Sequence, residues 1–408
     1  MEQHNVALLG AGGFAIGAHL PAIAATETLH LSAIYSRSLS SVNALLSAAR
    51  THSSTSHALS VYSEDPSTEG LDALLARADI HTVVLALPIT AQPAIIERAF
   101  RAGKNVVSEK PVAPSLAEAK RLIELYEREY RPLGLQWIVA EQYAYMQAME
   151  KARSLVQAGK IGELRGFSAE VYIQPSAAAG KTGWRSKPDY QGGFILDGGV
   201  HFAAGLRHIL SPSHSLTSIF ARASQIQPHL PPTDSLTGLL TASPSSPSSY
   251  TPDPPHDNAP KEVYGTFAFS FGTEKPSNTL LYTFRGSRGV LTVDFSSRRS
   301  HVVKLVNFPS ATSPPTSPTR NPSQGGEEDE TPHELVIELP TLGVEDEFLA
   351  LGSALVAGAG SGEAEEVERR SGPRAAMRDL GFIEGGLTSS REGREVALRD
   401  LGGELFEL

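Results

Sequence analysis

The pattern of hydrophobic and polar positions changes near residue 150 of the chain. Before that point, short apolar runs alternate with stretches in which apolar residues recur every three or four positions. Strands and helices are therefore predicted in turn. The expected strands span residues 5–9, 29–36, 60–62, 81–87, 105–108 and 135–140. This alternation predicts βαβ units with right-handed crossovers, and hence an α/β domain with a doubly wound parallel sheet.

After residue 150, stretches rich in β-branched and aromatic residues follow one another closely, which favours antiparallel pairing. Helices are predicted there over residues 146–158, 197–210, 343–357 and 372–387. We expect two domains: the α/β domain over residues 1–142, and an α+β domain over residues 143–408 with a large, mostly antiparallel open sheet. Two segments, residues 243–260 and 309–331, are rich in Ser, Pro and polar residues and are predicted to be disordered insertions.

Composition narrows the class of protein. The chain has 408 residues, 40% of them hydrophobic, and a net charge of −10 without a basic stripe, which disfavours nucleic-acid binding. It has no cysteine, which removes disulfides and thiolate chemistry, and we expect no metal site. The N-terminus lacks a basic region, and no apolar run approaches the roughly 20 residues that span a bilayer. The sequence predicts a cytoplasmic protein without a membrane partner.

A glycine-rich turn follows the first predicted strand. It reads Gly10-Ala11-Gly12-Gly13-Phe14-Ala15 and matches G-x-G-x-x-[GA]. In such a turn the first glycine permits the tight bend, the second lets the backbone approach a pyrophosphate, and the small third residue lets helix and strand pack closely. Backbone N–H groups at the helix start would hold the phosphates. The motif predicts a dinucleotide site, and the alternative is a plain glycine-rich βα turn.

The end of the second predicted strand bears on the choice of cofactor. An acidic residue usually stands there when the cofactor is NAD. This chain has Tyr35-Ser36-Arg37-Ser38 instead, and an arginine with two hydroxyls suits a 2′-phosphate. The run favours NADP over NAD, although Arg37 in a solvated loop is the alternative.

Two further strand ends are expected to face the nicotinamide half of the cofactor. One is Leu87-Pro88, and the other is Ser108-Glu109-Lys110-Pro111, where a cis bond before the proline is compatible with the sequence. A lysine at this edge can stabilise negative charge that develops on a substrate oxygen. The same tripeptide recurs as Glu274-Lys275-Pro276 in a turn-like stretch, so the tripeptide alone does not indicate a site. Lys110 is a candidate because it follows a predicted strand of the parallel sheet.

An aspartate and a histidine stand four residues apart in the second half of the chain, at Asp197 and His201. On a helix the two would share one face. Histidine is suited to proton transfer near neutral pH, and a nearby carboxylate would favour its protonated form. The alternative is structural, with Asp197 capping a helix and His201 buried in the core.

These ordered motifs resemble the glucose-fructose oxidoreductase / inositol dehydrogenase (Gfo/Idh/MocA) family over nearly the whole chain. The resemblance implies an N-terminal Rossmann domain, with Lys110 and His201 catalytic, His201 accepting the proton, and Asp197 as a polar partner of His201 or the substrate. It also implies that Trp184 and Arg185 lie near the cofactor. With the motifs above, the expected cofactor contacts are Gly10, Gly12, Gly13, Phe14, Ala15, Ser36, Arg37, Ser38, Leu87, Pro88, Gln92, Glu109, Lys110, Trp184 and Arg185.

One departure from the family pattern follows the fourth predicted strand. Many members have an asparagine and a histidine there, whereas this chain reads Leu87-Pro88-Ile89-Thr90-Ala91-Gln92.

The prediction is an NADP-dependent oxidoreductase that moves hydride between the nicotinamide and a hydroxyl or carbonyl carbon of a sugar, polyol or related small molecule. Its alternative is a regulatory protein of the same family that binds NADP without turnover. The resemblance also implies a homo-oligomer formed through the C-terminal sheet.

Overall fold

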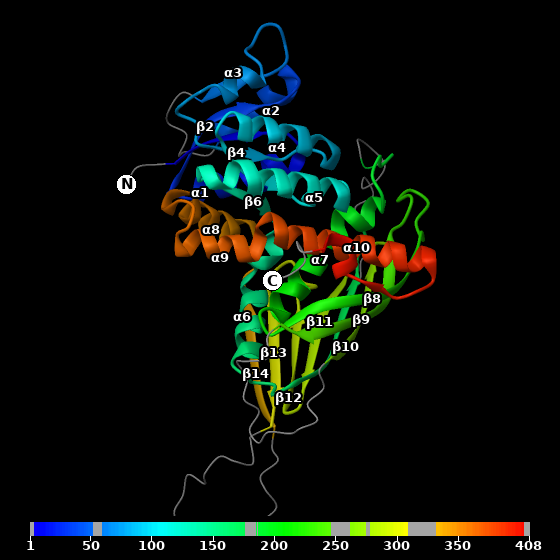
Figure 1. Ribbon diagram of the computed structural model, residues 1–408. Helices are drawn as coiled ribbons and strands as arrows, with labels where there is room; N and C mark the ends of the chain where they lie inside the picture. The colour runs from blue at the N-terminus through cyan, green and yellow to red at the C-terminus, as the bar shows by residue number, and fades with distance from the viewer. Residues whose placement is uncertain are drawn as a thin grey trace, which may run out of the picture.

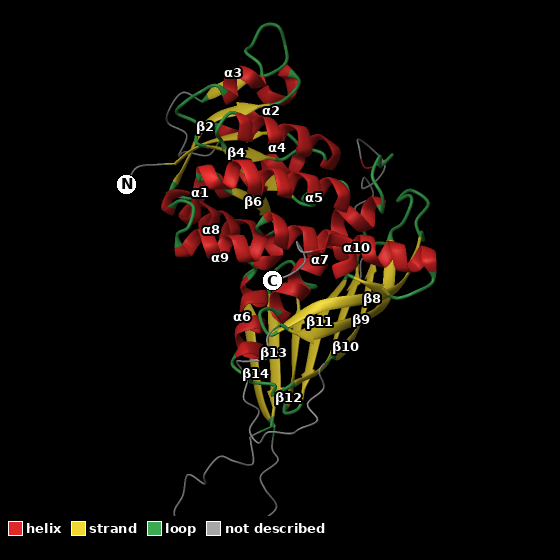
Figure 2. Ribbon diagram, in the orientation of Figure 1, coloured by secondary structure: helices red, strands yellow, loops and turns green. Residues whose placement is uncertain are grey.

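The computed structural model describes residues 4–51, 59–175, 185, 187–245, 262–274, 278–308 and 332–403. They form two halves that meet along a layer of helices (Figure 1). One half is a parallel sheet with helices on both faces, and the other is a larger sheet covered by helices on one face (Figure 2). Within the described residues, the helices are all too short or too polar to cross a membrane.

The N-terminal half contains the parallel sheet that the sequence predicts, with the strand order β3-β2-β1-β4-β5-β6. Its strands are β1 (His4–Leu9), β2 (Leu29–Tyr35), β3 (Ser60–Tyr62), β4 (Thr82–Leu85), β5 (Asn105–Glu109) and β6 (Trp137–Ala140). The strand order reverses between β1 and β4. In doubly wound sheets, ligands bind at the carboxyl ends of the strands beside such a reversal.

The helices of this half begin and end at residues suited to those positions. Ser38 caps α2 by accepting a hydrogen bond from the Ser41 N–H, Ser115 caps α5 in the same way, and Gly103 follows α4 with a positive φ of 69°. The main helices are α1 (Leu20–Ala25), α2 (Leu39–Ala49), α3 (Leu71–Leu75), α4 (Gln92–Arg101) and α5 (Leu116–Leu125). A π-helical segment, η1 (Ala15–His19), precedes α1, so Pro21 lies in the first turn of a helix rather than in the middle of one.

The second half is built on a nine-stranded sheet with the order β14-β13-β12-β11-β7-β10-β9-β8-β15. Its described pairs are antiparallel except β7 with β10, as a mostly antiparallel sheet requires. The strands are β7 (Leu164–Tyr172), β8 (His214–Ser224), β9 (Ser235–Pro244), β10 (Val263–Ser270), β11 (Thr279–Gly286), β12 (Gly289–Asp294), β13 (His301–Asn307), β14 (His333–Leu339) and β15 (Val396–Ala397). The insertion predicted from residue 243 thus begins inside β9, and most of both predicted insertions lies outside the described residues.

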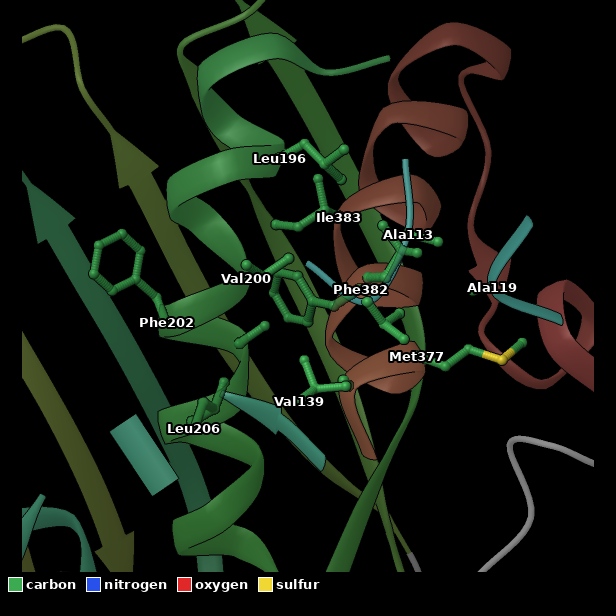
Figure 3. Packing of buried hydrophobic residues seen from close by; sticks show 14 of the residues in the cluster. Ala113, Ala119, Val139, Leu196, Val200, Phe202, Leu206, Met377, Phe382 and Ile383 are labelled. Atoms are coloured by element: carbon green, nitrogen blue, oxygen red, sulfur yellow. The ribbon is translucent and has the colours of Figure 1, made fainter. Parts of the chain in front are cut away.

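One face of this sheet is covered by helices. The helices of this half are α6 (Gln147–Gln157), α7 (Gly193–Leu210), α8 (Val344–Ala357), α9 (Gly362–Ser371), α10 (Pro373–Glu392) and α11 (Arg399–Gly402). Figure 3 shows Val200 of α7 pointing toward Phe382 and Ile383 of α10, while Phe202 points to the other side. There Phe202 meets Phe269 of β10, with ring centroids 5.3 Å apart. Each such side chain contributes roughly 1.5–3 kcal/mol when buried, so α7 is anchored on two sides.

Helix α8 crosses back to the first half of the chain. Its residues Phe348 and Leu351 are buried among residues of β1 and α1, including Leu8 and Ile23, and Figure 1 shows α8 beside α1. The division at residue 142 therefore stays a prediction, since a helix from the C-terminal quarter completes the core of the N-terminal half. This return also brings the start of α8 close to the carboxyl edge of the parallel sheet.

Candidate active site

The glycine-rich turn joins β1 to the π-helical segment, as the motif requires. Gly10 has a φ of 114°, and a Cβ added to it would lie 2.2 Å from the Ala86 carbonyl oxygen, so only glycine fits. A Cβ on Gly12 or Gly13 would meet nothing within 4 Å. Ala15 is buried, whereas Phe14 is 46% exposed. The turn is tight at its first glycine and open at the next two, which suits close approach by a pyrophosphate.

Two buried side chains at this edge of the sheet have polar atoms without a hydrogen-bond partner among the described residues. Gln92, at the start of α4, has neither its Oε1 nor its Nε2 hydrogen bonded, although it is only 1% exposed. His19, in the π-helical segment, has no partner for Nδ1. Buried polar atoms are normally satisfied. With the open glycine turn, these atoms fit a polar ligand along the edge of the sheet, where the sequence predicts a dinucleotide.

The residues that the sequence assigns to cofactor preference lie at the end of β2. Ser36 follows the strand, and its N–H donates to the Tyr62 carbonyl at 3.3 Å. Arg37 is exposed, and Ser38 is occupied by capping α2. The structure therefore leaves Arg37 as the charged group of this run, facing solvent beside the β1–β2 edge.

Lys110, at the end of β5, joins the two halves of the molecule. Its Nζ donates to the Asp197 carbonyl oxygen at 2.7 Å and to Asp197 Oδ1 at 3.1 Å. Arg185 Nε donates to the other carboxylate oxygen, Oδ2, at 2.5 Å. The Lys110–Pro111 bond is cis, as the sequence permits. Asp197 thus stands between one cation from the Rossmann half and one from the second half.

Two cations decide the protonation state of Asp197. Burial raises the pKa of this carboxyl, but Lys110 and Arg185 outweigh it and lower the pKa to about 2. Asp197 lies inside α7, whose N-cap is Gly192, so the alternative that it caps the helix is wrong. The aspartate is a fixed anion that holds Lys110 in place.

His201 lies one turn further along α7, and its partner differs from the one expected. Its Nδ1 lies 2.8 Å and 2.9 Å from the two carboxylate oxygens of Glu141, directly after β6. The ring also stacks on Tyr143 at a centroid distance of 5.1 Å. The prediction that Asp197 could partner His201 is therefore wrong for Nδ1, because Asp197 is taken by the two cations. Glu141 itself is fixed by the Tyr143 N–H, which donates to Oε1 at 3.1 Å.

A second histidine–carboxylate pair involves Glu109, the residue before Lys110. Its Oε1 lies 2.6 Å from Nε2 of His19. The His19 side chain is 1% exposed and that of Glu109 is 13% exposed, so the carboxylate is the member nearer the surface. The sequence singled out Glu109 as a cofactor contact but did not identify His19.

A third carboxyl group, Glu347 at the start of α8, lies near both pairs. It is 1% exposed, and its Oε1 has no described hydrogen-bond partner. Burial raises its pKa well above the ordinary value, and the charges of Glu109 and Glu141 raise it further. The neutral form of Glu347 is therefore favoured in the folded protein.

Some predicted residues remain outside this arrangement. Trp184 lies outside the described residues, as do Lys275 and Pro276 of the second Glu-Lys-Pro tripeptide. Leu87 and Pro88 follow β4 and are partly buried, and a Leu87 methyl lies 3.4 Å from the position of a Cβ built on Gly10. Among the described residues, no group of three or more His, Asp or Glu side chains could hold a metal ion.

Comparison with known protein families gives the class of protein. The oxidoreductase family with an NAD-binding Rossmann fold matches residues 4–136, and the GFO/IDH/MocA C-terminal domain matches residues 149–305. The chain belongs to the Gfo/Idh/MocA family of NAD(P)-binding oxidoreductases, as its motifs predict.

Individual proteins similar to this chain include a dehydrogenase and a sugar reductase. Dehydrogenase FPY6 of Fusarium mangiferae is 37% identical over 293 residues, which cover 70% of this chain and 76% of that protein. A dTDP-3,4-didehydro-2,6-dideoxy-alpha-D-glucose 3-reductase of Streptomyces violaceoruber is 35% identical over 199 residues, 48% of this chain and 52% of that protein.

Solved structures share the fold. An oxidoreductase from Thermotoga maritima has a TM-score of 0.72 at 22% identity and covers 98% of this chain and 100% of its own. KijD10, a 3-ketoreductase from Actinomadura kijaniata in complex with TDP-benzene and NADP, has a TM-score of 0.64 at 21% identity and covers 95% of this chain and 98% of its own.

Proposed function

We propose that the protein is an NADP-dependent reductase or dehydrogenase that acts on a carbonyl or hydroxyl carbon of a sugar, polyol or related small molecule. One observation carries the proposal. The group of Lys110 with Asp197 and the group of His201 with Glu141 lie one helical turn apart on α7, at the carboxyl edge of the Rossmann sheet. That edge is where this fold places the nicotinamide.

Lys110 is positioned to bind the reacting oxygen. An ammonium group has three N–H bonds, and Asp197 accepts two of them at its backbone and carboxylate oxygens. The third is available for a substrate oxygen, where the positive charge stabilises negative charge in the transition state. Asp197 stays ionised throughout the neutral range, so it fixes the lysine without exchanging a proton.

His201 is the proton donor for reduction and the acceptor for oxidation. Glu141 holds Nδ1, which leaves Nε2 as the nitrogen for the substrate. Among the described residues, Nε2 has no hydrogen-bond partner, and the side chain is 16% exposed. A bound nicotinamide supplies or accepts the hydride, and general acid–base transfer of this kind contributes roughly 10²–10⁴-fold to a rate.

The residues present fit such a cofactor along the whole sheet edge. Gly10, Gly12 and Gly13 would hold the pyrophosphate, and Glu109 would lie beside the nicotinamide ribose. Arg37 would bind the 2′-phosphate. KijD10 was solved with NADP, which agrees with this preference.

The proposal is tested by mixing the purified protein with NADPH and a panel of keto sugars, including nucleotide-linked 3-keto sugars, aldoses and inososes. We expect NADPH oxidation with at least one member, and a loss of roughly 10²–10⁴-fold in Lys110→Ala and His201→Ala. Tight binding of NADPH without turnover of any member would instead favour the regulatory alternative.

Cofactor preference is tested separately at Arg37. Arg37→Ala removes a charge from the predicted 2′-phosphate site, so the Kd for NADPH is expected to rise about tenfold, equivalent to roughly 1.4 kcal/mol. The Kd for NADH is expected to stay unchanged in the same calorimetric titration. An equal loss for both cofactors would contradict the assignment.

The homo-oligomer is also part of the proposal. On the outer face of the large sheet, Phe220 of β8 and Leu239 of β9 are directly paired and exposed, by 37% and 55%. Tyr264 of the neighbouring β10 is 65% exposed. Apolar groups gathered on an open sheet suit self-association, which light scattering would show as a mass above that of one chain. The cytoplasmic location stays a prediction.

A further inference from the structure

The imidazole of His201 is contacted in two different ways. At its edge, Nδ1 lies 2.8 Å and 2.9 Å from the two carboxylate oxygens of Glu141. On its face, the ring of Tyr143 is stacked at a centroid distance of 5.1 Å and an interplanar angle of 19°. Aromatic rings attract one another in offset stacks with centroids about 4.5–7 Å apart, so the second contact stabilises the observed position of the imidazole.

The two contacts restrict different motions of the ring. The contact with Glu141 fixes the position of one nitrogen, but it restricts the plane of the imidazole only weakly. The stacked ring of Tyr143 restricts that plane, because a tilted imidazole would collide with the aromatic face or lose contact with it. Together they set the direction in which Nε2 points. Proton transfer depends on this direction, since a proton donor must lie within hydrogen-bond reach of its acceptor.

Both contacts come from one short turn directly after β6. Glu141 is the N-cap of the 3₁₀ helix η5 (Gln142–Ala144), and its carboxylate accepts a hydrogen bond from the Tyr143 N–H at 3.1 Å. The carboxylate and the aromatic ring are therefore fixed relative to each other by the turn itself. His201 belongs to α7, so it meets a rigid pair of groups that a different element provides.

The ring of Tyr143 is itself held in place by its neighbours. Its edges contact Phe202 of α7 and Phe295, directly after β12, with centroids 5.6 Å and 5.9 Å apart. Phe202 points away from α10 (Figure 3), toward the large sheet. A Cβ on Gly205 of α7 would lie 3.3 Å from Tyr143 Cδ1, so a glycine at this position lets the ring lie close to the helix. The ring is therefore packed between α7 and the large sheet, against the face of His201.

We propose that Tyr143 is a positioning residue for proton transfer, whose ring fixes the plane of the His201 imidazole and thereby directs Nε2 toward the substrate. The aromatic ring carries this role and the hydroxyl does not, because the face of the ring makes the contact. The inference rests on the proposed function of His201 and deepens it by naming the side chain that orients the imidazole.

The first test uses the full chain without a substrate. Histidine rings are labelled with ¹³C, and the NMR signals of His201 are assigned by their loss in His201→Asn. Ring protons that lie over an aromatic face are shifted upfield by its ring current, so we expect upfield His201 signals in the wild type. Tyr143→Phe should keep these shifts, because it keeps the ring, and Tyr143→Leu should lose them.

Kinetics then connect the orientation of the imidazole with turnover, using a member of the sugar panel that the wild type reduces. Tyr143→Leu should lower kcat about tenfold to a hundredfold, because a small displacement of a reacting group has effects of this size. It should leave the Kd for NADPH unchanged, and Tyr143→Phe should keep the wild-type kcat. The matched control is Phe100→Leu, which removes a buried ring stacked on Tyr126 in the Rossmann half and should keep kcat.

A second variant, Tyr143→Met, fills the space with a flexible side chain and takes the place of Tyr143→Leu if that variant does not fold. The inference is overturned if the His201 signals of this variant or of Tyr143→Leu coincide with those of the wild type. It is also overturned if Tyr143→Phe changes these signals as much as Tyr143→Leu, or if Phe100→Leu lowers kcat as much. Signals that respond as expected in a protein that reduces no member of the panel would support the positioning of the imidazole and overturn the proposed function instead.

Discussion

Two histidine–glutamate pairs lie at the ends of neighbouring strands of the Rossmann sheet. They differ in which of the two side chains is buried and which is partly exposed. At the end of β5, His19 is buried, with 1% of its side chain exposed, and Glu109 is the outer member at 13%. After β6, the carboxylate of Glu141 is the buried member at 2%, and His201 is the outer one at 16%. The pair at β5 therefore exposes its carboxylate, whereas the pair at β6 exposes its imidazole.

The difference in which side chain is exposed suits the two pairs to different roles, cofactor binding and proton transfer. A carboxylate held from behind by a histidine is suited to accept hydrogen bonds from ribose hydroxyls, which do not exchange protons during the reaction. An imidazole held from behind by a carboxylate is suited to transfer a proton. The β5 pair is thus assigned to cofactor binding and the β6 pair to catalysis, and substitutions should separate them.

The largest contrast is expected between the two histidines. His201→Asn should lower kcat by roughly 10²–10⁴-fold, because it removes the proton donor, and should leave the Kd for NADPH unchanged. His19→Gln should do the reverse, raising the Kd for NADPH about tenfold, roughly 1.4 kcal/mol, with little change in kcat. Steady-state kinetics and NADPH titration measure both, and a similar kcat loss in the two variants would remove the distinction.

A smaller contrast is expected between the two glutamates. Glu141→Gln keeps the shape but removes the charge behind His201, so kcat should fall about tenfold to a hundredfold, part of the acid–base contribution.

Glu109→Gln serves as the matched variant of the other pair. It should weaken NADPH binding and leave kcat at saturating NADPH unchanged. If Glu141→Gln also weakens NADPH binding, or if Glu109→Gln lowers kcat as much as Glu141→Gln does, the two pairs do not have separate tasks.

The smallest effect is expected at Glu347, which lies near both pairs. Its pKa is raised in the folded protein, so the folded state holds its proton more tightly than the unfolded state. The stability that this proton contributes is complete below the ordinary glutamate pKa of about 4.3 and is lost as pH rises through the higher folded pKa. Relative to Glu347→Gln, wild type should therefore lose stability from about pH 4 toward neutrality.

Urea denaturation at pH 4 to 8 measures this effect. The control is Glu345→Gln, an exposed glutamate in the same turn of α8, whose difference from wild type should not vary in the same way. A difference at Glu347 that is independent of pH would show that its proton is not held by the fold.

The sequence predicted much of the fold, and it singled out the central residues of the candidate site, for physical reasons that act locally. Buried parallel strands are continuous apolar runs, and a positive φ of the kind seen at Gly10 selects glycine. Lys110 stood out because it follows a strand, and Asp197 and His201 because helical spacing places them on one face. Helix α9 was missed since only Val367 and Ser371 of its ten residues are buried, which gives no apolar stripe.

The partners of these residues were harder to find. His19 and Glu109 are 90 residues apart, and Glu141 and His201 are 60 apart, so only the tertiary fold brings them together. Glu141 had a usable signal, because it is a polar residue directly after the apolar run of β6, as Glu109 is at the end of β5. Glu347 had none, since its burial depends on the return of α8 to the first half of the chain.

The proposed mechanism assigns proton transfer to the outward imidazole of His201 and not to that of His19. The most direct measurement is a single-turnover experiment in which enzyme saturated with NADPH is mixed with a substrate from the panel, and loss of nicotinamide absorbance is followed for wild type, His201→Asn and His19→Gln. We expect wild-type rates for His19→Gln at saturating NADPH and a loss of roughly 10²-fold or more for His201→Asn. Equal rates for His201→Asn and wild type would contradict it.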